Sequence, residues 1–316
     1  MTLDNIKDAI DNAESVVIFA HEKPDGDAIG SSLAVYIAMK NLGKNVDVII
    51  PHFPDTFKFL PYSKEAKVEP SLKKYDLAIA VDCGDINRLD DPNETFLKSN
   101  VRVNIDHHIS NGMFGDLNYV DPVSPACSQI ITGIFKYYKY EITKEMAECL
   151  ITGIITDTGG FKYDGVTSET FEIASEFLDN GVNISRIYKD SLSNVSREKF
   201  EARKLAASRI EFLENNQITY TYITKSDMEK LHVDQNDLDG IVENGRDIEG
   251  VEISIFLYET DKGFKASLRS NHYVNVSDIC ILFNGGGHMK AAGCTLPYSL
   301  EEAKERIVTA SKRFLK

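Results

Sequence analysis

The sequence predicts an α/β protein with two domains joined by a helical linker. Three observations support this fold class. The first half alternates short runs of β-branched residues with helical patterns, the second half contains a strand pair joined by a tight turn, and a polar, charge-rich stretch separates them. With 316 residues, of which 42% are hydrophobic, the chain is long enough to build two separate cores.

Four strands are expected in the first half, at residues 15–20, 46–50, 76–81 and 101–105. Their nearly continuous apolar runs are typical of strands buried on both faces, so we expect a mostly parallel sheet covered by helices. A helical pattern runs from Ala28 to Leu42 and ends at Gly43, where a C-cap glycine belongs. Ligands of parallel sheets bind beyond the carboxyl ends of the strands. The polar residues that follow these strands are His21, Asp82 and Asp106.

A second helix is indicated over Ala147–Ile155, where apolar residues recur three and four apart. Thr143 is its expected N-cap, and Gly159 and the glycine after it are its expected stop. Asp157 then lies at the C-terminal end of the helix. A carboxylate in that position opposes the helix dipole, so it calls for a compensating cation.

A polar helical stretch begins near Asn183 and is expected to link the two domains. The expected boundaries are a first domain at 1–183, the linker at 184–213 and a second domain at 214–316. The second domain should contain strands at 218–223 and 251–258, a helix beginning near Ser226, and a turn at 261–263 followed by a strand at 264–268. The last two strands read as a hairpin.

The composition limits the function classes. Lys and Arg total 35 against 49 Asp and Glu, and the net charge of −14 disfavours an extended grip on long nucleic acid. A small anion still fits if metal ions or a few arginines supply local positive charge. Five widely spaced cysteines without a C-x-x-C pair favour reduced thiols and a cytoplasmic location. The opening residues do not resemble a signal peptide, and no apolar run is long enough to span a membrane.

Histidines and aspartates cluster at the expected strand and helix ends. The triplet Asp106-His107-His108 is joined by His21, Asp25 and Asp27 in one Pro/Gly loop, by Asp82, and by Asp157. Taken alone, Asp27 fits a helix N-cap and Asp82 fits a turn residue. Taken together, the four aspartates outside the triplet match the charge of two divalent cations about 3.5–4 Å apart. The histidines favour manganese over magnesium.

A glycine-rich segment near the C-terminus offers donors for a phosphate. Gly285, Gly286 and Gly287 precede His288, and Arg269 ends a nearby strand. Glycines let backbone amides approach an anion closely, and we expect a helix that starts near His288 to point its N-terminus at that anion.

These motifs, His21-x-x-x-Asp25-x-Asp27, Asp82, Asp106-His107-His108, Asp157 and Gly285-Gly286-Gly287-His288, together resemble the DHH phosphoesterases with a DHHA1-type C-terminal domain. The resemblance covers nearly the whole chain, and its two-domain size is similar to the bacterial nano-RNase/pAp phosphatase group. It implies a DHH domain, a smaller DHHA1 domain with a mixed sheet, and an active site in the interdomain cleft. The implied reaction is hydrolysis of short oligoribonucleotides to mononucleotides, and of 3′-phosphoadenosine 5′-phosphate (pAp) to AMP, by a two-metal-activated hydroxide.

The resemblance also implies roles for individual residues. One metal would be held by His21, Asp25 and Asp82, and the other by Asp27, Asp82, His107 and Asp157, with Asp82 bridging. His108 would contact the scissile phosphate or protonate the leaving oxygen, and Asp106 would orient a histidine. The substrate would be held by Arg269, Ser270, Gly286, Gly287 and His288. The metal would be Mn²⁺, with Mg²⁺ or Co²⁺ as alternatives. Asp85, Asn87 and Arg88 lie near these motifs without an assigned role.

Several alternatives stay open. A phosphodiesterase for cyclic or linear dinucleotides would use the same motifs, and a non-catalytic nucleotide-binding regulatory protein is an alternative of another class. A family II pyrophosphatase would lack the Gly-Gly-Gly-His segment, and a RecJ-type exonuclease would be longer. The expected partners are short RNA oligonucleotides or small nucleotides, without long duplex nucleic acid or a membrane, and a homodimer is left open.

Overall fold

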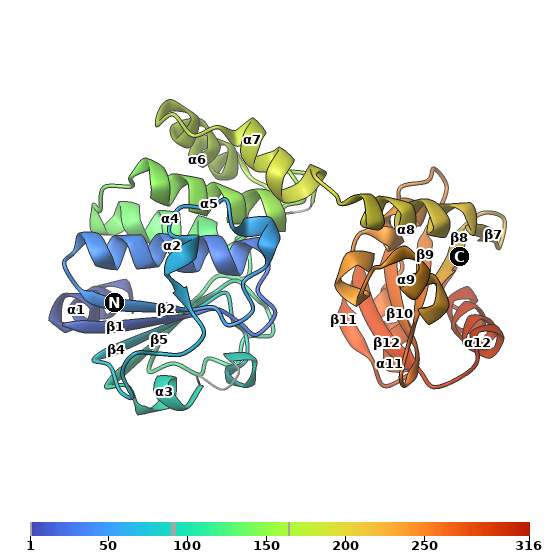
Figure 1. The fold of residues 1–316 in the computed structure, drawn as a ribbon, viewed down its shortest axis with the longest axis horizontal. Helices are drawn as coiled ribbons and strands as arrows, with labels where there is room; N and C mark the ends of the chain where they lie inside the picture. The colour runs from blue at the N-terminus through green and yellow to red at the C-terminus, as the bar shows by residue number, and fades with distance from the viewer. Residues whose placement is uncertain (1, 90–92, 164) are drawn as a thin grey trace. The chain divides into compact units, whose positions relative to one another are not determined.

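The computed structural model describes residues 2–89, 93–163 and 165–316. The chain forms two compact units, Met1–Asn194 and Val195–Lys316, each with its own hydrophobic core (Figure 1). The boundary between them falls within the polar stretch at 184–213. The two units are described separately below.

The first unit contains a six-stranded sheet in which every neighbouring pair is parallel. In sequence order its strands are β1 (Ser15–Phe19), β2 (Asn45–Ile49), β3 (Ala66–Lys67), β4 (Leu77–Val81), β5 (Val101–Asp106) and β6 (Leu117–Val120). Their order across the sheet is β3-β2-β1-β4-β5-β6. This confirms the mostly parallel sheet, and the structure adds two strands, β3 and β6, to the four that were expected. Every residue of β4 is buried because helices cover both faces, which explains its continuous apolar sequence.

Helices α2 (Gly26–Asn41), α4 (Cys127–Tyr138) and α5 (Lys144–Asp157) pack on one face of this sheet, and α3 (Asn93–Lys98) lies on the other (Figure 1). Both predicted helices are confirmed, and Thr143 is the N-cap of α5. The remaining helical elements are α1 (Thr2–Asn12), α6 (Ser168–Asp179), α7 (Ile184–Tyr188), a π-helical turn (Lys189–Ser193) and short 3₁₀ turns. Among the described residues, no helix is long and apolar enough to cross a bilayer.

Helices α2 and α5 approach each other closely through glycines. A β-carbon on Gly30 would lie only 2.3 Å from the carbonyl oxygen of Cys149. Because a β-carbon cannot come so close to a backbone oxygen, only glycine fits at this position. This close contact brings the start of α2 next to the end of α5, and both carry predicted site residues.

The second unit contains a mixed six-stranded sheet, ordered β11-β12-β10-β9-β8-β7. Its strands are β7 (Glu211–Leu213), β8 (Ile218–Ile223), β9 (Ile253–Thr260), β10 (Gly263–Ser270), β11 (Gly286–His288) and β12 (Ala291–Leu296). Strands β8 and β9 pair in parallel and the other pairs are antiparallel. The predicted hairpin is confirmed as β9 and β10, with Thr260 paired to Gly263.

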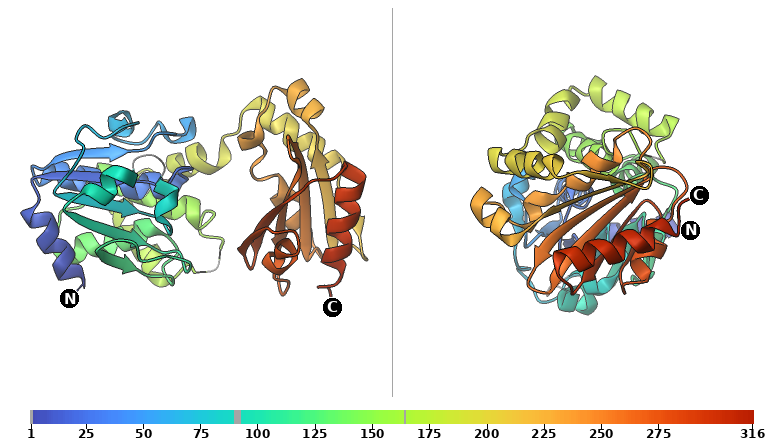
Figure 2. Two further views of the ribbon diagram at one scale, coloured as in Figure 1. Left: turned by 90° about the horizontal axis from the view of Figure 1, so that it is seen from below. Right: turned by 90° about the vertical axis from the view of Figure 1, so that its right-hand side faces the viewer.

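Helices cover both faces of this second sheet. Helices α11 (Val276–Ile281) and α12 (Leu300–Lys312) pack on one face, and Figure 2 shows α12 lying along it. Helices α8 (Arg197–Ser208), α9 (Lys225–Leu231) and α10 (Ile241–Arg246) pack on the other face. Helix α8 and strand β7 therefore belong to the core and sheet of the second unit, although they lie in the polar stretch at 184–213.

The helix predicted to start near His288 is wrong. Residues Gly286–His288 form strand β11, which pairs with β12 in antiparallel register. The glycines permit this pairing because they let the backbones come together, and a β-carbon on Gly285 would lie 2.3 Å from the carbonyl oxygen of Gly293. Strand pairing thus overrides the local helical pattern, and no helix N-terminus starts at His288.

Candidate metal centre

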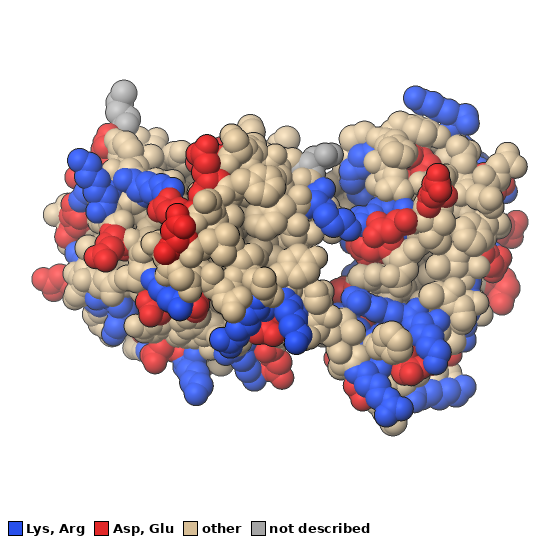
Figure 3. All heavy atoms as spheres, turned by 90° about the horizontal axis from the view of Figure 1, so that it is seen from above, with Lys and Arg blue, Asp and Glu red and all other residues tan. Residues whose placement is uncertain are grey.

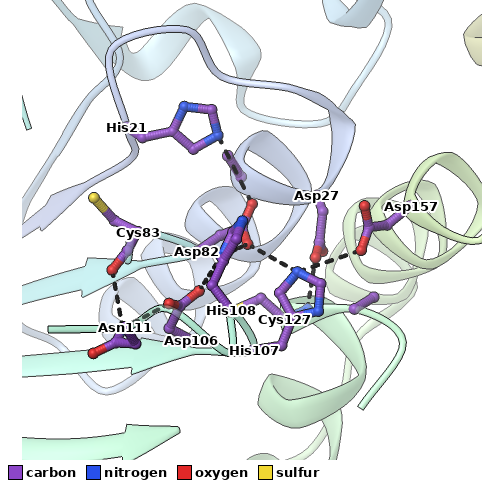
Figure 4. A network of polar contacts seen from close by, with 12 residues as sticks. His21, Asp27, Asp82, Cys83, Asp106, His107, His108, Asn111, Cys127 and Asp157 are labelled. Carbon is purple, nitrogen blue, oxygen red and sulfur yellow. Dashed lines mark hydrogen bonds and ion pairs between the residues drawn. The ribbon is translucent and has the colours of Figure 1, made fainter. Parts of the chain in front are cut away.

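Three predicted site residues lie at one edge of the first sheet (Figure 4). His21 lies two residues beyond β1, Asp82 follows β4 directly, and Asp106 is the last residue of β5. Since these strands are neighbours and parallel, their carboxyl ends meet at the same edge. The expectation that polar residues gather there is confirmed.

The loop between β1 and α2 carries two aspartates with different tasks. Asp25 is the N-cap of α2, because one oxygen of its carboxylate accepts hydrogen bonds from the backbone N–H groups of Asp27 and Ala28 at 3.0 and 3.1 Å. The reading of Asp27 as the cap of α2 is therefore wrong. Asp27 lies in the first turn of the helix and is 1% exposed.

Asp27 instead satisfies the N-terminus of α4. Its Oδ2 accepts a hydrogen bond from Cys127 N at 2.6 Å, and its Oδ1 accepts one from Ser128 N at 2.9 Å. The N-cap residue of α4 is Ala126, which has no side-chain acceptor of its own. The Asp27 carboxylate is thus held from a distant part of the sequence, with both oxygens in fixed positions.

The predicted ligand residues come together in three groups. In each group the ligand atoms lie within 4.8 Å of one another. The groups are His21, Asp25 and Asp82; Asp27, His107 and Asp157; and Asp82, His107 and His108. His107 Nε2 lies 3.5 Å from Asp82 Oδ1 and 3.4 Å from Asp157 Oδ2, so these residues surround one small volume (Figure 4). All six residues predicted as metal ligands are included.

The surroundings of Asp82 fit a cation. This side chain is 2% exposed, and its Oδ1 has no hydrogen-bond partner among the described residues. Asp82 also has a φ of +53°, in the left-handed region that costs energy for any residue except glycine. A buried carboxylate oxygen that accepts no hydrogen bond is unfavourable unless a cation contacts it. Carboxylate oxygens and imidazole nitrogens are ligands suited to Mn²⁺ and related divalent ions.

The carboxyl groups of the cluster also raise one another's pKa. Burial, with the neighbouring charge of Asp27, raises the pKa of Asp82 well above its usual value. Burial and Asp27 likewise raise the pKa of Asp157 to about 8. Burial lowers the pKa of His21 to about 4, and the nearby Arg88 acts in the same direction. Positive charge from bound cations would relieve this accumulation of buried acids.

Each histidine of the triplet has its own partner. His107 Nδ1 lies 3.2 Å from the carbonyl oxygen of Ser124, so Nδ1 carries the proton and Nε2 is left as a ligand atom. His108 Nδ1 lies 2.7 Å from Asp106 Oδ1. Asp106 therefore orients His108. Burial raises the pKa of Asp106, but hydrogen bonds from His108 and Asn111 outweigh it, and the net pKa lies below the usual value.

Three contacts were not found by sequence reasoning. Arg88 Nη2 lies 3.1 Å from His21 Nδ1, Ser124 contributes only its backbone carbonyl, and Asn111 donates to Asp106 at 2.6 Å. The sequence places Arg88 near the motifs but indicates no role for it. A single sequence gives no signal that a particular backbone carbonyl will accept a hydrogen bond from a histidine. Asn111 differs from any other loop asparagine only by lying three residues after His108.

The predicted substrate residues lie in the second unit. Arg269 and Ser270 end β10, and β11 contains Gly286, Gly287 and His288. Arg269 pairs with Ala291, which pairs in turn with His288, so Arg269 and His288 share one row on one face of the sheet. Arg269 Nε lies 2.9 Å from Glu243 Oε1. The buried Ser270 donates its hydroxyl to Val274 O at 2.7 Å, which leaves only its oxygen lone pairs for a ligand.

The comparisons with known proteins agree with this arrangement. Residues 15–154 match the DHH family N-terminal domain, and residues 215–316 match the DHHA1 domain. The bifunctional oligoribonuclease and PAP phosphatase NrnA of Thermus thermophilus is 33% identical over 305 residues, covering 95% of this chain and 90% of that protein. NrnA of Bacillus subtilis is 24% identical over 299 residues, covering 92% and 91%.

A solved structure shares the fold over the full length. The crystal structure of an exopolyphosphatase-related protein from Bacteroides fragilis matches with a TM-score of 0.93 and 29% identity, covering 99% of this chain and 96% of that one. This similarity agrees with the family matches and with the order of the site residues along the chain. The chain belongs to the DHH family, with a DHH domain followed by a DHHA1 domain.

Proposed function

We propose that this protein is a metal-dependent phosphoesterase that hydrolyses short oligoribonucleotides to mononucleotides and pAp to AMP. The observation that carries the proposal is the buried Asp82, whose Oδ1 accepts no hydrogen bond among the described residues and lies among further carboxylates and histidines. Such a cluster suits paired cations that act on phosphate esters. The substrate class is supported by the relatives from Thermus thermophilus and Bacillus subtilis, which are named for these two activities.

Two divalent cations would be held by the six clustered residues. We assign His21, Asp25 and Asp82 to one cation, and Asp27, Asp82, His107 and Asp157 to the other, with Asp82 shared. The groups of ligand atoms support this division. The mixture of imidazole and carboxylate ligands favours Mn²⁺, with Mg²⁺ or Co²⁺ as substitutes. Bound cations supply an acidified water and neutralise charge in the transition state.

His108 would act as the proton donor. Its Nδ1 proton is held by Asp106, so the doubly protonated ring would give its Nε2 proton to the leaving oxygen and keep the one on Nδ1. The buried carboxylate of Asp106 would hold the ring in this orientation and stabilise its protonated form, as in other Asp–His pairs. His107, whose Nδ1 is directed to Ser124, would keep its Nε2 for a cation.

The substrate would be held by residues of the second unit. We assign Arg269, Ser270, Gly286, Gly287 and His288 to the substrate's other phosphate or terminal nucleotide. The shared row of Arg269 and His288 supports this role, since both can contact one anion. A short substrate is favoured because the net charge is −14 and because acidic and basic side chains both occur on the face of each unit drawn in Figure 3.

The proposal is tested by a substrate panel. The purified protein with Mn²⁺ is incubated with pAp, di- to pentaribonucleotides, cyclic dinucleotides and pyrophosphate, and the kcat/KM values are ranked. We expect pAp and the shortest oligoribonucleotides to rank first. A preference for cyclic dinucleotides would favour the phosphodiesterase alternative, and a preference for pyrophosphate would contradict the substrate assignment. Nucleotide binding without any turnover would support a non-catalytic regulator.

A further inference from the structure

The side chain of Asn111 donates hydrogen bonds to Asp106 of the Asp-His-His triplet and to the backbone oxygen of Cys83 (Figure 4). Its Nδ2 donates to Asp106 Oδ2 at 2.6 Å and to Asn104 Oδ1 at 2.8 Å. Its Oδ1 accepts a hydrogen bond from Met113 N at 2.6 Å. The opposite orientation of the amide would bring its oxygen against three acceptor oxygens, so the network fixes which way Asn111 points.

The network is anchored in the sheet. Asn104 lies in β5 with 0% exposure, and its Nδ2 donates to Cys83 O at 3.1 Å, just beyond the end of β4. Asn111 therefore connects two neighbouring strands to the loop that follows the triplet. This anchor is rigid because buried strands in the centre of a sheet are the least mobile part of a domain.

Asp106 divides its two oxygens between two donors. Oδ1 accepts from His108 Nδ1 at 2.7 Å and Oδ2 accepts from Asn111. Asp106 is 0% exposed, so water cannot replace a lost donor without entering the core. If Asn111 were removed, Oδ2 would lose this donor, and the carboxylate would be free to turn away from the geometry that holds the His108 ring.

We propose that Asn111 is a positioning residue for the reaction. Through Asp106 it holds His108 with Nδ1 as the donor to the carboxylate and Nε2 free for the leaving oxygen. The inference rests on the proposed role of His108. Within the described residues, none of the hydrogen bonds of Asn111 goes to the six residues assigned to the cations. Its removal should therefore impair proton donation and spare cation binding.

The first test compares two leaving groups in the Asn111→Leu variant. Hydrolysis of a diribonucleotide expels a ribose alkoxide, which needs a proton, whereas hydrolysis of bis(p-nitrophenyl) phosphate releases a nitrophenolate, which does not. We expect kcat for the diribonucleotide to fall about 10- to 100-fold, with KM little changed. The nitrophenyl ester should lose less than about threefold, and Mn²⁺ affinity measured by calorimetry should be unchanged. An equal loss on both esters, or a loss of Mn²⁺ affinity, would overturn the inference.

Asn118→Leu is the matched control. Asn118 follows in the same segment and exchanges two hydrogen bonds with the backbone of Gly115, at 2.9 and 2.8 Å. It stabilises the local chain without contacting Asp106, so the Asn118→Leu variant should show no difference between the two leaving groups. Asn111→Ala repeats the test with a smaller side chain that cannot clash, and it must show the same selectivity as Asn111→Leu.

A second readout does not depend on turnover. Nitrogen NMR of the imidazole rings in the Mg²⁺-loaded protein reports which nitrogen of His108 carries a proton. At a pH where the ring is neutral, wild type should show the proton on Nδ1 alone, and Asn111→Leu should show a mixture of the two neutral tautomers. Unchanged ring signals in the variant would overturn the inference.

His108→Gln separates the two hypotheses. If kcat of this variant falls by the same factor on both esters, the proposed proton donation by His108 is wrong. If His108→Gln loses activity mainly on the diribonucleotide while Asn111→Leu loses activity equally on both esters, the role of His108 stands and only the inference on Asn111 fails.

Discussion

A β-carbon on Gly153 would lie 2.5 Å from Oδ1 of Asp27. The same atom would lie 2.0 Å from the hydroxyl oxygen of Ser128. Helix α5 thus passes so close to Asp27 that only a glycine can face it. Asp27 is confined between this glycine and the backbone donors at the start of α4, and this confinement fixes a carboxylate that we assign to a cation.

Substitution of Gly153 should therefore weaken cation binding. In Gly153→Ala the new methyl group displaces Asp27 from its two backbone donors, and we expect Mn²⁺ affinity in calorimetry to fall at least about tenfold. The control is Gly133→Ala on α4, where no atom lies within 4 Å of the added carbon. This change should leave the affinity unaltered and stabilise the fold by about 0.5–1 kcal/mol. Equal affinities in wild type and Gly153→Ala would contradict the prediction.

The metal-free protein should lose stability as the pH rises through the pKa of Asp157. Because this pKa is raised to about 8, the folded state holds a proton that the unfolded state has already released at pH 6.5. The folded state binds more protons in this window, so the free energy of unfolding falls as the pH increases. We expect wild type to lose about 1–2 kcal/mol more than Asp157→Asn between pH 6.5 and 8.5.

Urea denaturation with a chelator measures this difference. Added Mn²⁺ should restore stability more strongly at pH 8.5 than at pH 6.5, because the cation binds the deprotonated carboxylate and competes with its proton at the lower pH. Parallel pH profiles for wild type and Asp157→Asn would show that Asp157 does not carry the effect.

A buried carboxylate away from the cluster gives a stability prediction of the opposite sign. Asp47 is 5% exposed and accepts hydrogen bonds from Lys67, Ser71 and Tyr75 at 2.6, 2.7 and 2.5 Å. Burial raises the pKa of Asp47, but these hydrogen bonds outweigh it and bring the pKa to about 2. The contribution of Asp47 to the free energy of unfolding is then fully present above its unfolded-state pKa of about 4, and it is lost as the pH falls towards 2.

Asp47→Asn should cost about 2–4 kcal/mol of unfolding free energy at pH 7. The difference in unfolding free energy between the variant and wild type should become smaller at pH 2.5. The kcat/KM of the variant at pH 7 should equal that of wild type. Denaturation curves at the two pH values check the stability difference, and a difference that stays constant would show that the charge of Asp47 is not involved.

The success of the sequence predictions follows from burial. The strands β1, β2, β4 and β5 and the helices α2 and α5 were predicted because their apolar patterns report contact with the core. Asp157 was placed correctly at a helix end because Gly159 and Gly160 adopt positive φ angles of 58° and 74°. The six ligand residues were identified from residue type and from their positions at strand and helix ends.

The failures concern contacts between distant segments. Strand β11 has no alternating pattern, and its conformation comes from pairing with β12. Local spacing could not show that Asp25 caps α2 while Asp27 caps α4, a helix that begins about 100 residues later. The role of Asn111 likewise depends on a chain path that brings a loop back over β4 and β5.

Arg269 should act on substrate binding rather than on the chemical step. We expect Arg269→Ala to raise KM for pAp about tenfold, as loss of one charged hydrogen bond would, with kcat within about threefold of wild type. Arg102→Ala is the control, since Arg102 is also ion-paired, with Asp116 at 2.5 Å. Steady-state kinetics of both variants decide the matter. A fall in kcat at constant KM would place Arg269 in the chemical step instead.

The most direct test of the account is turnover by Asp82→Ala. The wild-type protein and the variant are each incubated with Mn²⁺ and a diribonucleotide, and the mononucleotide released is measured by chromatography. Because Asp82 is assigned to both cations, we predict that the rate in the variant falls by at least about 10³-fold, with fewer Mn²⁺ ions bound per chain. Turnover by Asp82→Ala at the wild-type rate would contradict the two-cation site and the proposed function built on it.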